Sequence, residues 1–161
     1  AAHFVGERMQ ARVPKLGTSY SVSLWFWNGM PYDSRAVLGW MFSRGRNHAR
    51  QTGEHLGLNA KGQLIFRSST KTHTAKTHTA KTSANRWQWH HAVLVRDGDT
   101  ARVYLDGQLQ FEAKANALLP VETLHLGGRN DNESNWEGRL DEAAVFDRAL
   151  SATEVKALSA P

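Results

Sequence analysis

The sequence predicts an all-β protein, a sandwich of two antiparallel sheets with a short C-terminal helix. Short runs of alternating or apolar residues recur along the chain, as in residues 20–27 and 87–96. Turn residues such as Asp97-Gly98-Asp99 separate these runs. No long helical pattern interrupts them until the C-terminus. Regularly spaced short strands without long helices favour a sandwich.

Length and composition narrow the class of protein. The 161 residues fit one domain over 1–161, long enough to bury a single core. An excess of 20 Lys and Arg over 15 Asp and Glu would attract anionic partners at low salt. The absence of cysteine excludes disulfides and thiolate metal sites. No apolar run approaches the roughly 18 residues of a membrane span, so we expect none.

The first core strand is predicted over residues 20–27. Its alternation places apolar residues on one face and a mixed set on the other, namely Ser21, Ser23, Trp25 and Trp27. The two tryptophans could stack on a sugar ring, or they could pack against a loop or the second sheet. Packing is the commoner use of large aromatic side chains, and the sequence leaves both uses open.

Two hairpins are predicted further along the chain. Residues 54–58 and 63–67 flank a turn that contains Gly62, and residues 87–96 and 101–105 flank the turn at Gly98. His90 and His91 fall on opposite faces of the second hairpin. Neither has a partner at metal-ligand spacing on its strand, so we expect both to be structural.

Residues 71–84 contain Lys-Thr-His-Thr-Ala twice in succession. A period of five matches neither a strand nor a helix, so we expect no constant face. The favoured interpretation is a solvated low-complexity hairpin or loop, although threonine permits extended structure. Its basic residues and histidines leave binding of an anionic polymer or of a metal open.

The C-terminal stretch predicts a strand followed by a helix. Leu140 and Val145 differ in parity, which implies a bulge near Asp141 if both are buried. Ser151 and Glu154 have the spacing of a capping box, so a helix should open at Ser151. That helix should turn Val155 and Leu158 onto the body of the protein.

Several segments in this order resemble the laminin-G-like, concanavalin A-like lectin/glucanase jelly-roll family. They are residues 20–27, 89–98, 103–107 (Val-Tyr-Leu-Asp-Gly), 126–128 (Leu-Gly-Gly), 138–142 (Gly-Arg-Leu-Asp-Glu) and 148–151 (Arg-Ala-Leu-Ser). The resemblance covers nearly the whole chain and implies a jelly-roll sandwich whose first segment pairs with the terminal strand. The fold hosts binding modules, adhesion modules and enzymes, so it does not fix the function.

Calcium is the one cofactor that the resemblance implies. Many members of the family hold one Ca²⁺ with the aspartate that corresponds to Asp141. The remaining ligands would come from the amino-terminal strands, where Glu7 and the backbone carbonyl at Gly6 are the obvious candidates. Calcium takes six to eight oxygen ligands, and the loop 130–135 is also rich in them. A structural use of Asp141 remains the alternative.

Catalysis has little support in the sequence. Glu137 and Asp141 lie four apart on one predicted strand, but no third acid completes the pattern of the fold's glucanases. No Gly-x-Ser-x-Gly elbow is present, which disfavours nucleophilic catalysis. The basic residues are scattered and belong to no recognised nucleic-acid module, so we expect no nucleic-acid partner.

We therefore expect a noncatalytic carbohydrate-binding or adhesion module of a larger secreted or cell-surface protein, extracellular or periplasmic. The ligand would be a glycan, and the basic loops leave an anionic one open. A structural accessory domain and a glycoside hydrolase or lyase are the alternatives. The candidate ligand-binding residues are the rings of Trp25, Trp27, Trp87 and Trp136 and the hydroxyl-binding groups of Arg129, Asn130, Asp131 and Asn132.

Overall fold

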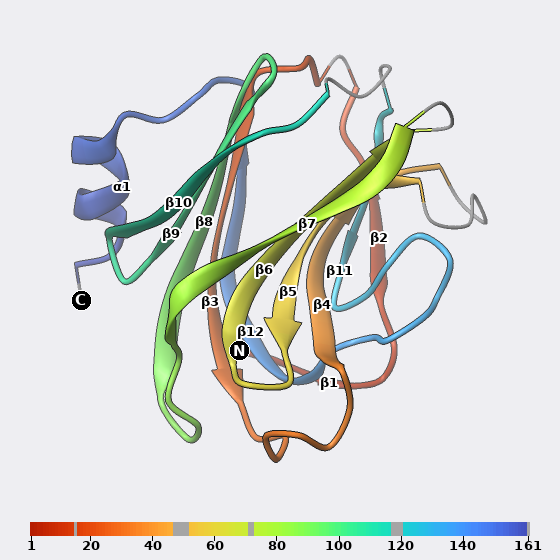
Figure 1. The fold of residues 1–161 in the computed structure, drawn as a ribbon, viewed down its shortest axis with the longest axis vertical. Helices are drawn as coiled ribbons and strands as arrows, with labels where there is room; N and C mark the ends of the chain where they lie inside the picture. Colours follow the sequence, from red (N-terminus) through yellow and green to blue (C-terminus); the bar gives the residue numbers. More distant parts are fainter. Residues whose placement is uncertain (15, 47–51, 71–72, 117–120, 161) are drawn as a thin grey trace.

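The computed structural model describes residues 1–14, 16–46, 52–70, 73–116 and 121–160. Two antiparallel six-stranded sheets face each other, and one short helix lies outside them (Figure 1). Sheet A has the order β1 (Ala2–Val5), β12 (Glu137–Phe146), β3 (Tyr20–Asn28), β8 (Trp89–Asp97), β9 (Thr100–Leu105) and β10 (Gln108–Lys114). Sheet B has the order β2 (Met9–Arg12), β11 (Thr123–Leu126), β4 (Val37–Arg44), β5 (Gly53–Asn59), β6 (Gln63–Thr70) and β7 (His73–Ser83). The predicted jelly-roll sandwich is confirmed.

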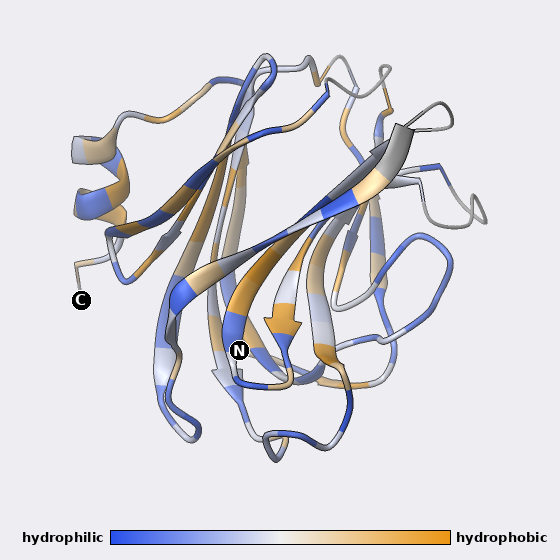
Figure 2. Ribbon diagram, viewed as in Figure 1, coloured by the Kyte–Doolittle hydropathy of each residue, from blue (hydrophilic) through white to orange (hydrophobic). Residues whose placement is uncertain are grey.

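The core lies between the two sheets, as the alternation in β3 predicts. One face of β3 is completely buried and consists of Tyr20, Val22, Leu24 and Phe26. Side chains of sheet B meet it from the other side, among them Phe42, Leu56 and Phe66. Hydrophobic and hydrophilic residues alternate along the strands, and hydrophilic stretches mark many of the loops (Figure 2). The pairing of β1 with β12 also confirms the expectation for the first segment.

A charged cluster crosses the interior at one end of the sandwich. Arg96 of sheet A donates from Nε to Glu54 Oε1 of sheet B at 2.7 Å, and both side chains are 1% exposed. The Tyr20 hydroxyl donates to the second carboxylate oxygen of Glu54. Arg44 stacks over the Tyr20 ring with its guanidinium carbon 4.7 Å from the ring centroid. The cluster therefore ties the two sheets together through a buried carboxylate, a contact that the sequence reasoning missed.

The predicted bulge in β12 is present. Leu140 lies opposite Phe26 and Val145 opposite Val22, and the register shifts between Asp141 and Ala144. The extra residue keeps Leu140 and Val145 on the inner side of the sheet despite their different parity. Leu140 is buried, whereas Val145 is 37% exposed at the open edge between the sheets.

The C-terminal helix α1 (Ala152–Leu158) packs on the outer face of sheet A. Ser151 is its N-cap, and the reciprocal bonds between Ser151 and Glu154 form the predicted capping box. Val155 is buried in a small cluster with side chains of β8 and β9. Leu158 is 38% exposed, so the prediction that it turns onto the body holds only in part. The helix covers part of sheet A's outer face.

Replacing Ser151 with alanine should lower the free energy of unfolding by about 1 kcal/mol, because an orphan amide of the helix loses its acceptor. Urea unfolding followed by tryptophan fluorescence measures the change. Ser83→Ala, an exposed serine on β7, is the control and should change stability by less than about 0.5 kcal/mol. Equal stability of Ser151→Ala and the wild type would show that the cap contributes nothing.

The repeat segment forms an edge strand over residues 73–83 that pairs antiparallel with the preceding strand, so the hairpin alternative is confirmed and the loop alternative is wrong there. β7 pairs along β6, with His73 opposite Thr70 and His78 opposite Phe66. These partners are four residues apart in β6, although the histidines are five apart in β7. A register shift between Ser68 and Thr70 absorbs the extra residue. The bulge thus lets the first repeat unit span four positions on β6, and a second register shift lies between Gln63 and Ile65. Lys71 lies outside the described residues.

Candidate functional site

The outer face of sheet A carries a group of four indole rings, Trp25, Trp27, Trp87 and Trp89, which we call the tryptophan face. Alternation along β3 points Trp25 and Trp27 outward, opposite His91 and Trp89 of β8. Trp89 is 39% exposed and Trp87 is 59% exposed, while Trp25 and Trp27 are half-buried. Exposed aromatic side chains grouped in this way are unusual on a surface that serves no interaction.

A hollow of about 320 Å³ opens between two of these rings and the carboxylates of β12. It is lined by Trp25, Trp89, Asp141, Glu142 and Ala160. Asp141 reaches this face because it lies opposite Trp25 in the pairing of β12 with β3. A shallow site with indole walls and carboxylate acceptors can stack on an apolar ring face and accept hydrogen bonds from hydroxyl groups.

Asp141, one of the two carboxylates, is held by two partners. It accepts a hydrogen bond from the backbone amide of Glu142 at 3.0 Å and pairs with the amino group of Ala1 at 3.2 Å. The hydrogen bond from that amino group is the main reason why the pKa of Asp141 is lowered. Asp141 is therefore ionised near neutral pH and can act only as an acceptor.

His91 packs beside Trp25 on the neighbouring strand. The two ring centroids are 5.1 Å apart, and His91 Nε2 lies 2.7 Å from the Ser23 hydroxyl. Burial lowers the pKa of His91, so the imidazole is neutral at neutral pH. His90 faces the interior and lies 2.8 Å from Asp106. Both histidines thus lie in structural positions, as the sequence suggested.

Trp87 is held at the end of the face in a strained backbone conformation. Its φ angle is 65°, in the left-handed region that residues other than glycine seldom adopt. Its amide donates to the carbonyl of Asn28 at 3.1 Å, and its ring meets Trp27 edge-on with centroids 5.1 Å apart. Strain of this kind persists where the surrounding structure fixes a side chain in one place.

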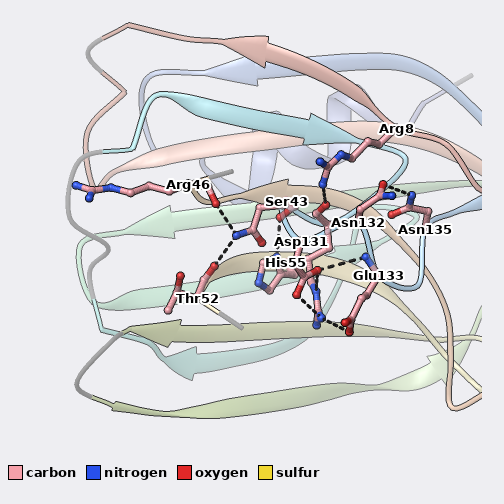
Figure 3. Close-up of polar contacts among 11 residues, drawn as sticks. Arg8, Ser43, Arg46, Thr52, His55, Asp131, Asn132, Glu133 and Asn135 are labelled. Carbon is pink, nitrogen blue, oxygen red and sulfur yellow. Dashed lines mark hydrogen bonds and ion pairs between the residues drawn. The ribbon is translucent and has the colours of Figure 1, made fainter. Parts of the chain in front are cut away.

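The polar residues predicted to bind hydroxyl groups lie elsewhere, on the loop that follows β11 (Figure 3). Arg129 donates from Nε and Nη2 to the carboxylate of Asp131 at 2.7 Å and from Nη2 to Glu133 at 3.1 Å. Asn130 is completely buried and donates to the carbonyls of Arg46 and Thr52. These groups fix the loop against sheet B, so they do not join the tryptophans in one site.

Asn132 is the exposed member of that predicted polar set. Its carboxamide oxygen accepts a hydrogen bond from Asn135 at 2.9 Å, and its φ angle of 66° places it in a turn. The loop also covers His55, which lies 2.7 Å from the Ser43 hydroxyl and is completely buried. Burial and then the nearby charge of Arg129 lower the pKa of His55 to about 3. The loop therefore encloses a neutral histidine.

Trp136 does not offer a ring to a ligand. It is completely buried and meets Phe26 edge-on in the core, with centroids 6.1 Å apart. The prediction that it stacks on a sugar is wrong for this structure. In β12, which follows Trp136, Gly138 lies on the inner side of the sheet. Arg139 lies on the outer side, opposite Trp27, and so belongs to the tryptophan face.

The structure does not bring the predicted calcium ligands together. Asp141 lies beside Ala1 at one end of the pairing between β1 and β12, whereas the Gly6 amide bonds Trp136 at the other end. Five residues of strand separate the two places, about 17 Å. The Gly6 carbonyl accepts a hydrogen bond from Asn135 at 2.7 Å, and Glu7 is exposed. The described residues also contain no group of three His, Asp or Glu side chains placed to hold a metal.

Two members of the hollow were missed in the sequence, Trp89 and Glu142. Alternation already placed Trp89 on the outer side of β8 together with His91, so that signal was available. Glu142 reaches the hollow because the β12 bulge gives it a φ angle of 46°. The position of such a side chain depends on the bulge and could not be read from parity.

The fold and the tryptophan face define a lectin-like sandwich domain. The family described as the concanavalin A-like lectin/glucanases superfamily matches residues 7–156. The chain belongs to this family. No curated protein matches it in sequence.

Solved structures share the fold at low sequence identity. Domain 4 of the extracellular GH43 arabinanase AbnA from Geobacillus stearothermophilus, in complex with arabinotriose, is 17% identical, with a TM-score of 0.75 over 98% of this chain and 75% of that one. The CBM40 of the Ruminococcus gnavus IT-sialidase, bound to α2,3 sialyllactose, is 16% identical, with a TM-score of 0.72 over 91% and 85%. A heptameric SAP-like pentraxin from Limulus polyphemus is 18% identical, with a TM-score of 0.69 over 89% and 70%.

Proposed function

We propose that this chain is a noncatalytic carbohydrate-binding module whose ligand lies on the tryptophan face. A sugar ring would stack on Trp89 and Trp25, and its hydroxyl groups would donate to Asp141 and Glu142. The observation that carries the proposal is the hollow of about 320 Å³ between exposed indoles and carboxylates. Solved domains of the same fold hold arabinotriose and sialyllactose, which supports a glycan as the ligand class.

We further propose that the chain works as one module of a larger secreted or cell-surface protein, in an extracellular or periplasmic setting. The arabinanase whose domain 4 shares the fold is an extracellular enzyme, which supports this setting. In the part of the chain that the structure describes, no helix has the length and apolar character needed to cross a membrane.

The tryptophan face disfavours a purely structural accessory role. A structural role would be favoured if all six tryptophans of the chain were buried. Trp40 and Trp136 are buried. Trp87 and Trp89, however, expose 59% and 39% of their surface to solvent. Burying a large indole side chain is favourable, and grouped exposed apolar side chains usually mark an interaction site. A binding role therefore explains these exposed indoles better than a structural role.

The positions of the carboxylates disfavour glycoside hydrolysis. Glu137 and Asp141 are four residues apart on β12, and no third acid completes the pattern of the fold's glucanases. Glu137 is also paired with Arg35 at 3.1 Å. This ion pair gives Glu137 a structural role and disfavours its use as a catalytic acid.

Replacing Trp89 with alanine should lower the affinity for the glycan about 30-fold. A central tryptophan commonly contributes about 2 kcal/mol or more to the free energy of binding, which corresponds to that change. A glycan array identifies the ligand, and isothermal titration calorimetry measures the affinities of wild type and variant. The array should carry arabinans, xylans, β-glucans and sialylated and sulfated glycans.

Leu109→Ala is the matched control, since Leu109 is an exposed apolar residue on β10 and lines no part of the hollow. It should bind like the wild type, and circular dichroism should show both variants folded. Wild-type protein that binds no glycan on the array would refute the proposed function. Trp89→Ala binding with wild-type affinity would refute its location.

A further inference from the structure

Two arginines extend the tryptophan face beyond the hollow. The guanidinium carbon of Arg139 lies 4.9 Å from the Trp27 ring centroid, and that of Arg86 lies 4.6 Å from the Trp87 centroid. The two rings are themselves 5.1 Å apart, so the four groups form a continuous row. Cations stacked on indoles in this way are attracted by the electron-rich ring faces.

Arg139 has no acidic partner among the described residues, and its side chain is exposed. Glu137, two residues earlier on the same side of β12, is paired with Arg35 at 3.1 Å. Stacking uses the flat face of a guanidinium and leaves its in-plane N–H groups free. A fork of N–H donors held in this orientation matches the two oxygens of a carboxylate or a sulfate.

The charges along β12 are therefore separated by sign. Asp141 and Glu142 line the hollow, whereas Arg139 stands two residues away on Trp27, about 7 Å along the strand. An acid group would be repelled at the hollow and attracted at Arg139. A sugar chain that crosses this face would lie with an uncharged ring in the hollow and its acid group beside Trp27.

We infer that the ligand is an acidic glycan and that Arg139 binds the carboxylate or sulfate on the sugar next to the one in the hollow. This inference rests on the proposed function and names its ligand class. Arg86 is less suited to the same task, because it is half-buried and its Nη2 donates to the carbonyl of Gly29 at 2.8 Å. The positive charge of Arg86 still adds to the attraction for an acid group at this end of the tryptophan face.

The experiment compares acidic glycans with their neutral counterparts on one array. The pairs are tetragalacturonic acid and its methyl ester, sulfated and desulfated galactan, and sialylated and asialo lactose. Wild-type protein should prefer the acidic member of at least one pair about tenfold, as expected for one charged hydrogen-bonded contact. That preference should shrink as NaCl rises, because exposed charges are screened.

Arg139→Gln should remove the preference and still bind the neutral member. Arg12→Gln, the control, removes one exposed arginine from β2 of sheet B and should keep the preference. Equal or tighter wild-type binding of the neutral members would overturn the inference while leaving the proposed function intact. So would a preference that persists in Arg139→Gln. Failure to bind any glycan would refute the proposed function itself, and the inference with it.

Discussion

Replacing Glu54 with glutamine is expected to lower the free energy of unfolding by about 3 to 5 kcal/mol. The carboxylate of Glu54 accepts from Arg96 and from the Tyr20 hydroxyl, and Arg44 stacks on that same tyrosine. Removing the negative charge leaves two guanidinium groups inside the sandwich without a carboxylate. Guanidinium groups remain charged at any practical pH, so the core would have to hold uncompensated charge. Urea unfolding at pH 7 measures the loss.

Two further variants separate the buried charge from a general effect of losing a carboxylate. Glu112→Gln breaks the exposed pair between Glu112 and Arg102 and should cost less than about 1 kcal/mol. The double variant Glu54→Leu/Arg96→Met removes both buried charges and should be more stable than Glu54→Gln alone, because apolar side chains can replace a buried ion pair. A Glu54→Gln protein as stable as the wild type would contradict the role assigned to this cluster.

Acidification is expected to destabilise the protein already above the range where carboxylates titrate. The pKa of His55 is about 3 in the folded protein, against 6.5 for an ordinary histidine. Between these two values the unfolded chain binds a proton that the folded chain excludes, so stability is complete above pH 6.5 and falls as the pH drops. The loss from His55 is about 1.4 kcal/mol per pH unit below 6.5, on the order of 3 kcal/mol at pH 4.

His125 adds to this loss, because burial lowers its pKa to about 4. The free energy of unfolding, measured in urea at steps between pH 7 and 5, should therefore decline with a slope that His55→Gln makes shallower. His3→Gln replaces an exposed histidine and should leave the slope unchanged. A stability that stays constant from pH 7 to 5 would show that the buried histidines are protonated in the folded state.

The sequence was sufficient for the fold because the central strands of sheet A turn a mainly apolar face to the core. The alternation in β3, the turn at Gly98 and the capping box at Ser151 are local signals, and all three are confirmed. The bulge near Asp141 could be predicted as well, because Leu140 and Val145 required one extra residue between them. These elements could be predicted because each depends mainly on residues that are close together in the sequence.

The site was harder to predict because it depends on which strands become neighbours. The tryptophans of β3 and β8 come together across a strand pair, and β12 adds Asp141 from the other side. Trp136 has the same chemistry, but it lies just before β12 with its ring buried in the core. Arg129 looked like a ligand-binding cation until the structure showed its carboxylate partner two residues away. Composition identifies the residue types, and topology decides which of them reach solvent together.

The edge position of β7 has a consequence for how the repeat can change. The pairing with β6 is already irregular, because His73 and His78 lie opposite residues four apart on β6, whereas His78 and Ser83 lie opposite residues three apart. An edge strand pairs on one side only, so an added residue disturbs one ladder rather than two. The tryptophans stand on the other sheet, so a change in the number of units along this border would leave the proposed ligand contacts in place.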